Sequence, residues 1–245
     1  MNRLELLSTH LHQYRLKILS LLLLVSLGTI SSTASAFWLL GFASADTLPP
    51  GALGVIAGTG AQLADAGKPS QTSFTPFLPH AGFRYGVSDN MDVGYRLTQV
   101  ALPYSSAGPS LGGELDAKYQ FAPSANGWRT ALVGGMAYSY LDISGVSKSA
   151  WSPGVDWVMS RILTPKYTLI SELRYVYTAI PSATGGSANN FVNALGADLG
   201  TKIKLTQQVS LIPEVGLFNL SGQLLGKNAN GVGLQIGAVL AIRIW

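Results

Sequence analysis

The main residues of this sequence that could do chemistry are charged side chains that recur at every second position. Glu114, Asp116 and Lys118 follow this spacing, and so do Glu172 and Arg174. Side chains two residues apart on an extended strand point to the same face, so acids and bases would alternate along one surface. Such a surface can form paired ion networks or line a path for a polar solute, and both alternatives stay open at this point.

His80 is the other candidate for chemistry. A general base needs a nucleophile and an orienting group within reach, and the sequence offers Ser73 in the preceding loop and Glu114 two strands further on. A catalytic His80 and a solvated or hydrogen-bonded His80 are therefore alternatives. The chain has no cysteine, which excludes thiolate metal sites and cysteine nucleophiles. No metal-ligand cluster and no cofactor motif is predicted; Gly58-Thr-Gly60 lacks the third glycine of a dinucleotide turn.

The residues that must position these charges alternate in the manner of β-strands. The stretch GFRYGVSDNMDVGYRL (82–97) places an apolar residue at every second position on both sides of Ser88-Asp89-Asn90. A strict period of two predicts strands, and the short polar break predicts a hairpin. In a soluble sheet the apolar face would point into a core, whereas in a membrane barrel it would point at lipid.

The rest of the chain repeats this pattern. Strands are predicted at 51–59, 79–87, 91–100, 112–121, 128–141, 154–163, 167–179, 191–205, 209–220 and 231–245. Short connections alternate with long ones, which are expected at 60–78, 101–111, 142–153, 180–190 and 221–230. This alternation is typical of transmembrane barrels with tight periplasmic turns, whose strand number is even. The count of about ten, within a range of 8–12, needs 51–59 as a strand; its alternative is a plug that threads the lumen.

Across these strands one face carries apolar side chains without a charge, including Phe83, Leu173 and Leu240. Aromatic residues gather at both strand ends, among them Trp128 near the short turns and Phe218 toward the long loops. The opposite face is rich in small residues and predicts a lumen lined by these charges: Arg84, Asp92, Arg96, Glu114, Asp116, Lys118, Arg129, Glu172, Arg174, Asp198, Lys202, Glu214 and Arg243. A bilayer enforces such sorting, because a lipid-facing Lys or Arg costs roughly 2–4 kcal/mol at the midplane.

The N-terminus predicts an export signal over residues 1–45. Arg15 and Lys17 precede the apolar run Ile18 to Ile30, and small residues follow it. Cleavage is predicted after Ala36 or Ala45, which leaves a single barrel domain over 46–245; an uncleaved anchor is the alternative.

The composition agrees with an exported barrel and excludes several classes of protein. Charged residues make up only 11% of the chain, well below the roughly 25% usual in soluble domains. The net charge of +4 is too small and too scattered for a nucleic-acid-binding protein.

The hairpin RYGVSDNMDVGYRL and the final stretch GVGLQIGAVLAIRIW resemble the strands of small bacterial outer-membrane β-barrel proteins. This resemblance implies an all-β, closed, antiparallel up-and-down barrel in the outer membrane, in contact with lipid. It also implies that the barrel-assembly machinery reads the last strand with its terminal aromatic, Trp245. The expected function is porin-like or structural, with passage of small solutes, and an enzyme is the less favoured class. The alternatives are a rim hydrolase for lipid or peptide and a surface adhesin or receptor that uses the long loops.

Overall fold

A computed structural model describes residues 44–66, 71–75, 77–100, 110–143, 146–180, 190–224, 227–228 and 230–244. The predicted signal segment up to residue 43 and the terminal Trp245 lie outside the described residues. The described part consists of strands and their connections, and it contains no helix long and apolar enough to cross a membrane.

Twelve strands make up this part of the chain. Their bounds are β1 Leu53–Ala66, β2 Gln71–Thr75, β3 His80–Ser88, β4 Met91–Val100, β5 Ser110–Gln120, β6 Trp128–Ile143, β7 Val146–Ile162, β8 Tyr167–Ile180, β9 Asn190–Lys204, β10 Val209–Leu224, β11 Lys227–Asn228 and β12 Gly231–Arg243.

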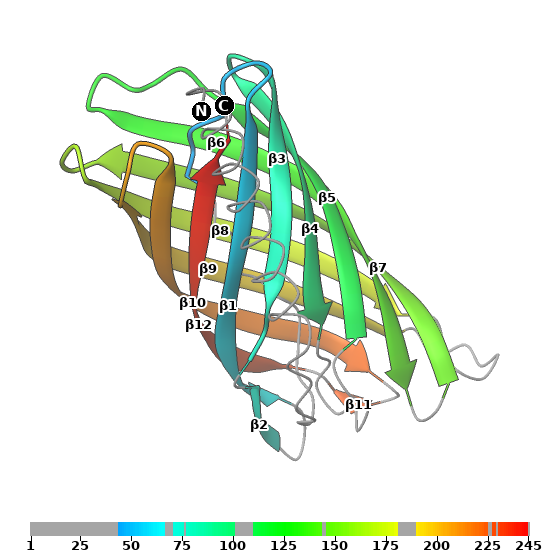
Figure 1. The fold of residues 1–245 in the computed structure, drawn as a ribbon. Helices are drawn as coiled ribbons and strands as arrows, with labels where there is room; N and C mark the ends of the chain where they lie inside the picture. Colours follow the sequence, from blue (N-terminus) through cyan, green and yellow to red (C-terminus); the bar gives the residue numbers. More distant parts are fainter. Residues whose placement is uncertain are drawn as a thin grey trace, which may run out of the picture. The chain divides into compact units, whose positions relative to one another are not determined.

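Ten of these strands close into one antiparallel barrel (Figure 1). Each strand from β3 to β10 pairs with the next, and β12 and β1 complete the ring. The short β2 pairs only with β1, and β11 only with β10. β1 pairs with β12 from Gly54 to Ala66 and with β3 from Leu53 to Gly58. The first segment is therefore a wall strand, as the ten-strand count requires, and the alternative of a plug at 51–59 is wrong.

The short connections gather at one end of the barrel, together with both ends of the described chain. The main-chain N–H of Arg243 donates to Gln208, and that of Ile244 donates to Leu53. The hydroxyl of Thr47 donates to the carbonyl of Asp89 in the β3–β4 turn. Because short turns face the periplasm in bacterial outer-membrane barrels, we call this the periplasmic end.

Several strands continue further than the sequence pattern predicts. The long connection expected at 142–153 is wrong, because β6 and β7 pair continuously up to Ile143 and Val146. These strands have 16 and 17 residues. At about 3.3 Å per residue they reach well past an apolar band of roughly 25 Å. Beyond the band no lipid sorts the two faces of a strand, so main-chain pairing can continue without the apolar alternation that marks a membrane strand.

The burial of the side chains decides which face meets lipid. The apolar face is the exposed one, with Leu217 at 65%, Leu173 at 52% and Phe83 at 48% of full exposure. The charged face is enclosed by the barrel, with Asp92 at 0% and Arg96 at 6%. A soluble sheet would bury the first set and expose the second. The exterior is therefore a hydrocarbon-facing surface, and the chain is a transmembrane barrel.

Two residues of β10 have unusual local surroundings, and one of them, Phe218, departs from the sequence prediction. Phe218 is not part of an aromatic belt: it is 4% exposed and lies inside the barrel, where its ring covers Gly233 on β12. Pro213 lies inside β10, where a missing N–H would favour a bulge. The register with β9 is the same before and after Pro213, so no residue is inserted and only the pairing of Ile212 and Pro213 to β9 is interrupted.

Candidate functional site

The segment between Ser44 and Ala52 precedes β1 and lies against the periplasmic end of the lumen. The ammonium of Lys118 donates to the main-chain oxygens of Ser44, at 3.1 Å, and Asp46, at 2.6 Å. The N–H of Leu48 donates to Asp92 at 3.1 Å, and the carboxylate of Asp46 pairs with Arg129. Interior charges thus hold this segment on the barrel, although it has no strand pattern of its own.

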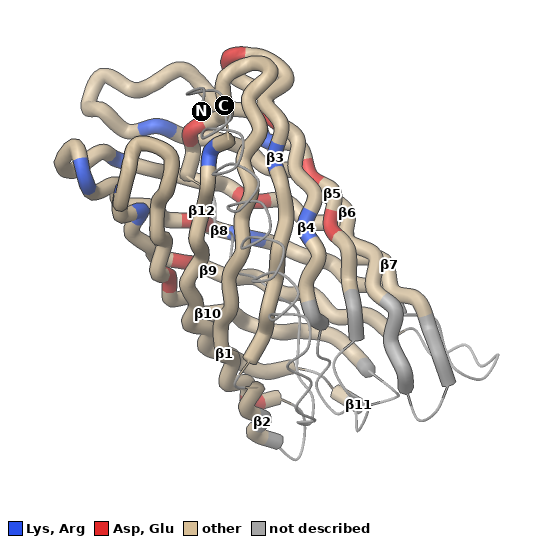
Figure 2. Tube along the Cα trace, viewed as in Figure 1, with Lys and Arg blue, Asp and Glu red and all other residues tan. Residues whose placement is uncertain are grey.

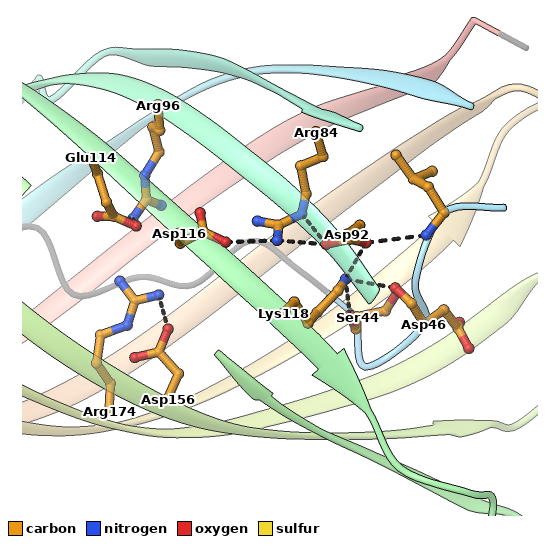
Figure 3. Close-up of polar contacts among 11 residues, drawn as sticks. Ser44, Asp46, Arg84, Asp92, Arg96, Glu114, Asp116, Lys118, Asp156 and Arg174 are labelled. Carbon is orange, nitrogen blue, oxygen red and sulfur yellow. Dashed lines mark hydrogen bonds and ion pairs between the residues drawn. The ribbon is translucent and has the colours of Figure 1, made fainter. Parts of the chain in front are cut away.

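A four-residue network lies on the lumen side of β3, β4 and β5 beside this segment (Figure 3). Arg84 on β3 binds Asp92 on β4 and Asp116 on β5, each at 2.6 Å, and Lys118 lies 3.3 Å from Asp92. Arg84 reaches the second strand because Gly94 stands between them in the ladder. A Cβ atom on Gly94 would lie 2.6 Å from the guanidinium of Arg84 and 2.8 Å from the carboxylate of Asp116. The absent side chain is therefore a condition for this network.

Two further ion pairs come from residues that face each other directly in the ladder (Figure 3). Arg96 pairs with Glu114 at 2.7 Å, and Arg174 pairs with Asp156. All four side chains line one small cavity inside the barrel. An isolated buried charge has no partner to compensate for its lost hydration. Here each enclosed charge has a partner of opposite sign.

Three carboxylates on β8, β9 and β10 lie beyond these pairs. Glu172 stands directly opposite Asp198, and both interact electrostatically with Glu214 and with Arg174. All three are less than a tenth exposed. Neither carboxylate oxygen of Glu172 has a hydrogen-bond partner among the described residues. This side of the lumen therefore holds more acidic than basic groups.

Three cavities lined by described residues follow one another inside the barrel. The largest, at the periplasmic end, has a volume of about 580 Å³, and we call it the vestibule. The next has about 30 Å³ and shares Ile56 and Arg84 with the vestibule; the third has about 60 Å³ and shares Glu114 and Arg174 with the second. Because one water needs roughly 10–15 Å³ of such cavity volume, the two inner cavities hold only a few waters each.

The vestibule has a strong excess of positive charge. Seven basic side chains line it: Arg84, Lys118, Arg129, Lys166, Lys202, Lys204 and Arg243. The acidic residues in its lining are Asp46, Asp89 and Asp92. Figure 2 shows most of the charged residues gathered toward this end of the barrel.

His80 lies inside the barrel rather than on an open rim. It begins β3, is 3% exposed, and stands between Thr98 on β4 and Gly58 on β1 in the ladder. Gly58 leaves room for the imidazole, since a Cβ atom there would lie 2.7 Å from Nε2. Glu114 is bonded to Arg96, and Ser73 pairs with Ala64 on β1. Within the described residues no catalytic arrangement forms around His80.

Each charge expected in the lumen has a definite place in the structure. Arg84, Asp92, Lys118, Arg129, Lys202 and Arg243 line the vestibule, and Arg96, Glu114, Asp116, Glu172 and Arg174 line the inner cavities. Asp198 and Glu214 are buried beside Glu172. Sequence analysis missed Asp46 and Lys166, because both lie outside strands and period-two spacing cannot assign them a face. It also missed Asp156, although Asp156 stands two residues before Val158 and four before Ser160, a spacing that places all three on one face of the strand.

Comparisons with known proteins support the fold. No protein-family model and no curated sequence matches this chain. The outer-membrane protease OmpT of Escherichia coli superposes with a TM-score of 0.51 at 9% identity, covering 82% of this chain and 100% of that one. An outer-membrane channel from Pseudomonas putida F1 gives a TM-score of 0.52 at 12% identity, covering 83% of this chain and 100% of that one. At such identities the likeness concerns the fold, which is that of bacterial outer-membrane barrels.

Proposed function

We propose that this protein is a porin-like channel for small polar solutes whose lumen is closed at its middle by paired charges. The observation that carries the proposal is the series of three cavities. They share charged lining residues, so the polar interior continues from the vestibule past Arg84 to Arg174. Solute would pass if the side chains between the cavities moved apart.

The energetics of buried charge support a role beyond holding the barrel together. Replacing a buried ion pair by apolar groups of similar volume is often neutral or stabilising. A barrel whose interior served only to fill space could therefore use side chains like those of Ile170, Ile212 and Val239, which pack inside this one. The paired charges instead keep the lumen polar and hydrated, which suits a polar solute.

A structural barrel without transport is the second candidate. The two inner cavities of about 30 and 60 Å³ favour it, since neither admits a solute much larger than water in this arrangement. Ten strands enclose little more space than eight, whose interior side chains nearly fill. The described residues give no support to a rim hydrolase, because His80 is buried without a catalytic arrangement, and none of them favours an adhesin.

Planar-bilayer recordings distinguish the two candidates. Replacing both Arg96 and Glu114 with alanine removes an entire ion pair, so neither member stays behind without the other. We expect small, infrequent currents from the native barrel and a severalfold larger unitary conductance from this double variant. Leu115→Ala is the matched control, because it lies next to Glu114 on β5 but faces lipid. If native protein and double variant are both as impermeable as protein-free bilayers, the channel proposal is wrong and the structural candidate stands.

A further inference from the structure

We propose that the vestibule is a binding site for a small multivalent oxyanion, a soluble molecule that carries phosphate or carboxylate groups. The cavity has about 580 Å³, within the roughly 300–1,000 Å³ of small-molecule sites. Its lining holds four more basic than acidic side chains. The proposal stands on this binding surface and does not depend on whether the barrel conducts.

The basic groups of the vestibule differ in how they are neutralised. Arg84 and Lys118 share Asp92, and Arg129 pairs with Asp46. Among the described residues, no carboxylate lies within 4.0 Å of Lys202, Lys204 or Arg243. The cations of β9 and β12 are therefore the ones that remain available to a ligand.

These cations converge on one space. Lys202 and Lys204 are two residues apart on β9 and so project to the same face. Lys202 interacts electrostatically with the carboxylate of Asp46, which attracts it, and with three cations, which repel it: Arg243, Arg129 and Lys204. Like charges that enclose a common cavity repel each other, and an anion between them relieves this repulsion.

The chemistry of the lining favours an oxyanion with more than one charge. The guanidinium of Arg243 offers paired N–H donors that match the geometry of phosphate or carboxylate oxygens. The ammonium groups of the two β9 lysines add point charges, and Thr168 and Ser210 contribute hydroxyl groups to the lining. Since the excess is several charges, a multivalent anion should bind much more tightly than a monovalent one.

Calorimetric titration of the purified barrel in zwitterionic micelles tests the inference. Pyrophosphate and citrate should bind saturably at low ionic strength and at least about tenfold more weakly near 0.2 M salt, where charges are strongly screened. The double variant Lys202→Gln with Arg243→Gln should lower the affinity at least about tenfold. Arg161→Gln is the matched control, because Arg161 is an exposed cation near the same end that stacks on Trp128 outside the vestibule. Heat-modifiable gel mobility verifies that each variant is folded.

Three results would overturn the assignment. The first is the absence of saturable anion binding at low ionic strength, and the second is equal affinity in the native protein and the Lys202–Arg243 double variant. The third is displacement of pyrophosphate by phosphatidylglycerol mixed into the micelles, which would assign the site to a lipid headgroup. All three readouts are binding measurements, so a barrel that passes no current still tests this inference fully.

Discussion

Replacing Asp92 with alanine removes the acceptor on which three separate parts of the chain converge. Its carboxylate binds Arg84 at 2.6 Å, lies 3.3 Å from Lys118, and accepts the N–H of Leu48 at 3.1 Å. The side chain is fully enclosed. After the substitution Arg84 still has Asp116, and Lys118 still has two main-chain oxygens, whereas Leu48 loses this acceptor.

The size of the effect follows from these remaining partners. Removing one member of a buried ion pair costs about 3–5 kcal/mol, because the other member stays enclosed without compensation. Since both cations keep other acceptors, we expect the lower end, about 3 kcal/mol of unfolding free energy. At about 1.4 kcal/mol per factor of ten, this lowers the folding equilibrium constant roughly a hundredfold.

Urea-induced unfolding in lipid vesicles, followed by tryptophan fluorescence, measures this change. Asp89→Ala is the matched control: Asp89 is exposed in the β3–β4 turn, and Thr47 binds its main-chain carbonyl rather than its side chain. It should change stability by no more than about 0.5 kcal/mol. Equal destabilisation by Asp92→Ala and Asp89→Ala would refute the network as a source of stability.

The remaining predictions concern the exterior, the acidic groups and the N-terminus. Leu217→Arg on the lipid face should cost about 2–4 kcal/mol, and Leu205→Arg in a periplasmic turn about 0–1 kcal/mol, in the same unfolding assay. At neutral pH, Glu114→Gln should destabilise the barrel, because it weakens the ion pair between Glu114 and Arg96. An intact mass of the exported protein should show that Ser44 is retained, since its carbonyl accepts a hydrogen bond from the interior; a mature chain that begins at residue 46 would contradict this.

The strands and their faces could be predicted because one physical requirement repeats at every second residue. Lipid outside and enclosed charge inside sort Phe83 from Arg84 and Leu173 from Arg174, so the face of each residue follows from parity. Hairpin turns mark the periplasmic strand ends with polar residues, which is why the predicted starts of β4, β6 and β8 match the observed ones. The face of a residue and the start of a strand can therefore both be predicted without knowledge of the three-dimensional contacts.

The extent of the strands and the partners of the charges do not follow from parity. Beyond the membrane the requirement that sorts the two faces is absent, so the extended β6–β7 hairpin has no sequence signature. The partner of a lumen charge depends on the stagger between strands: Arg96 meets Glu114 directly, whereas Arg84 reaches Asp116 across Gly94. Asp46 is bound by Arg129, a residue 83 positions away that no local pattern connects to it.

Glycine explains how so narrow a lumen holds so many charges. Beside Glu214 the ladder places Gly200, and a Cβ atom there would lie 2.6 Å from the side chain of Glu214, as a Cβ on Gly94 would lie 2.6 Å from the guanidinium of Arg84. The space that a charged side chain occupies is therefore space that its cross-strand neighbour gives up. Under the proposed channel function, the constriction consists of charged side chains that occupy gaps left by glycines. Removing a complete pair should therefore widen the lumen while the glycines around it stay in place.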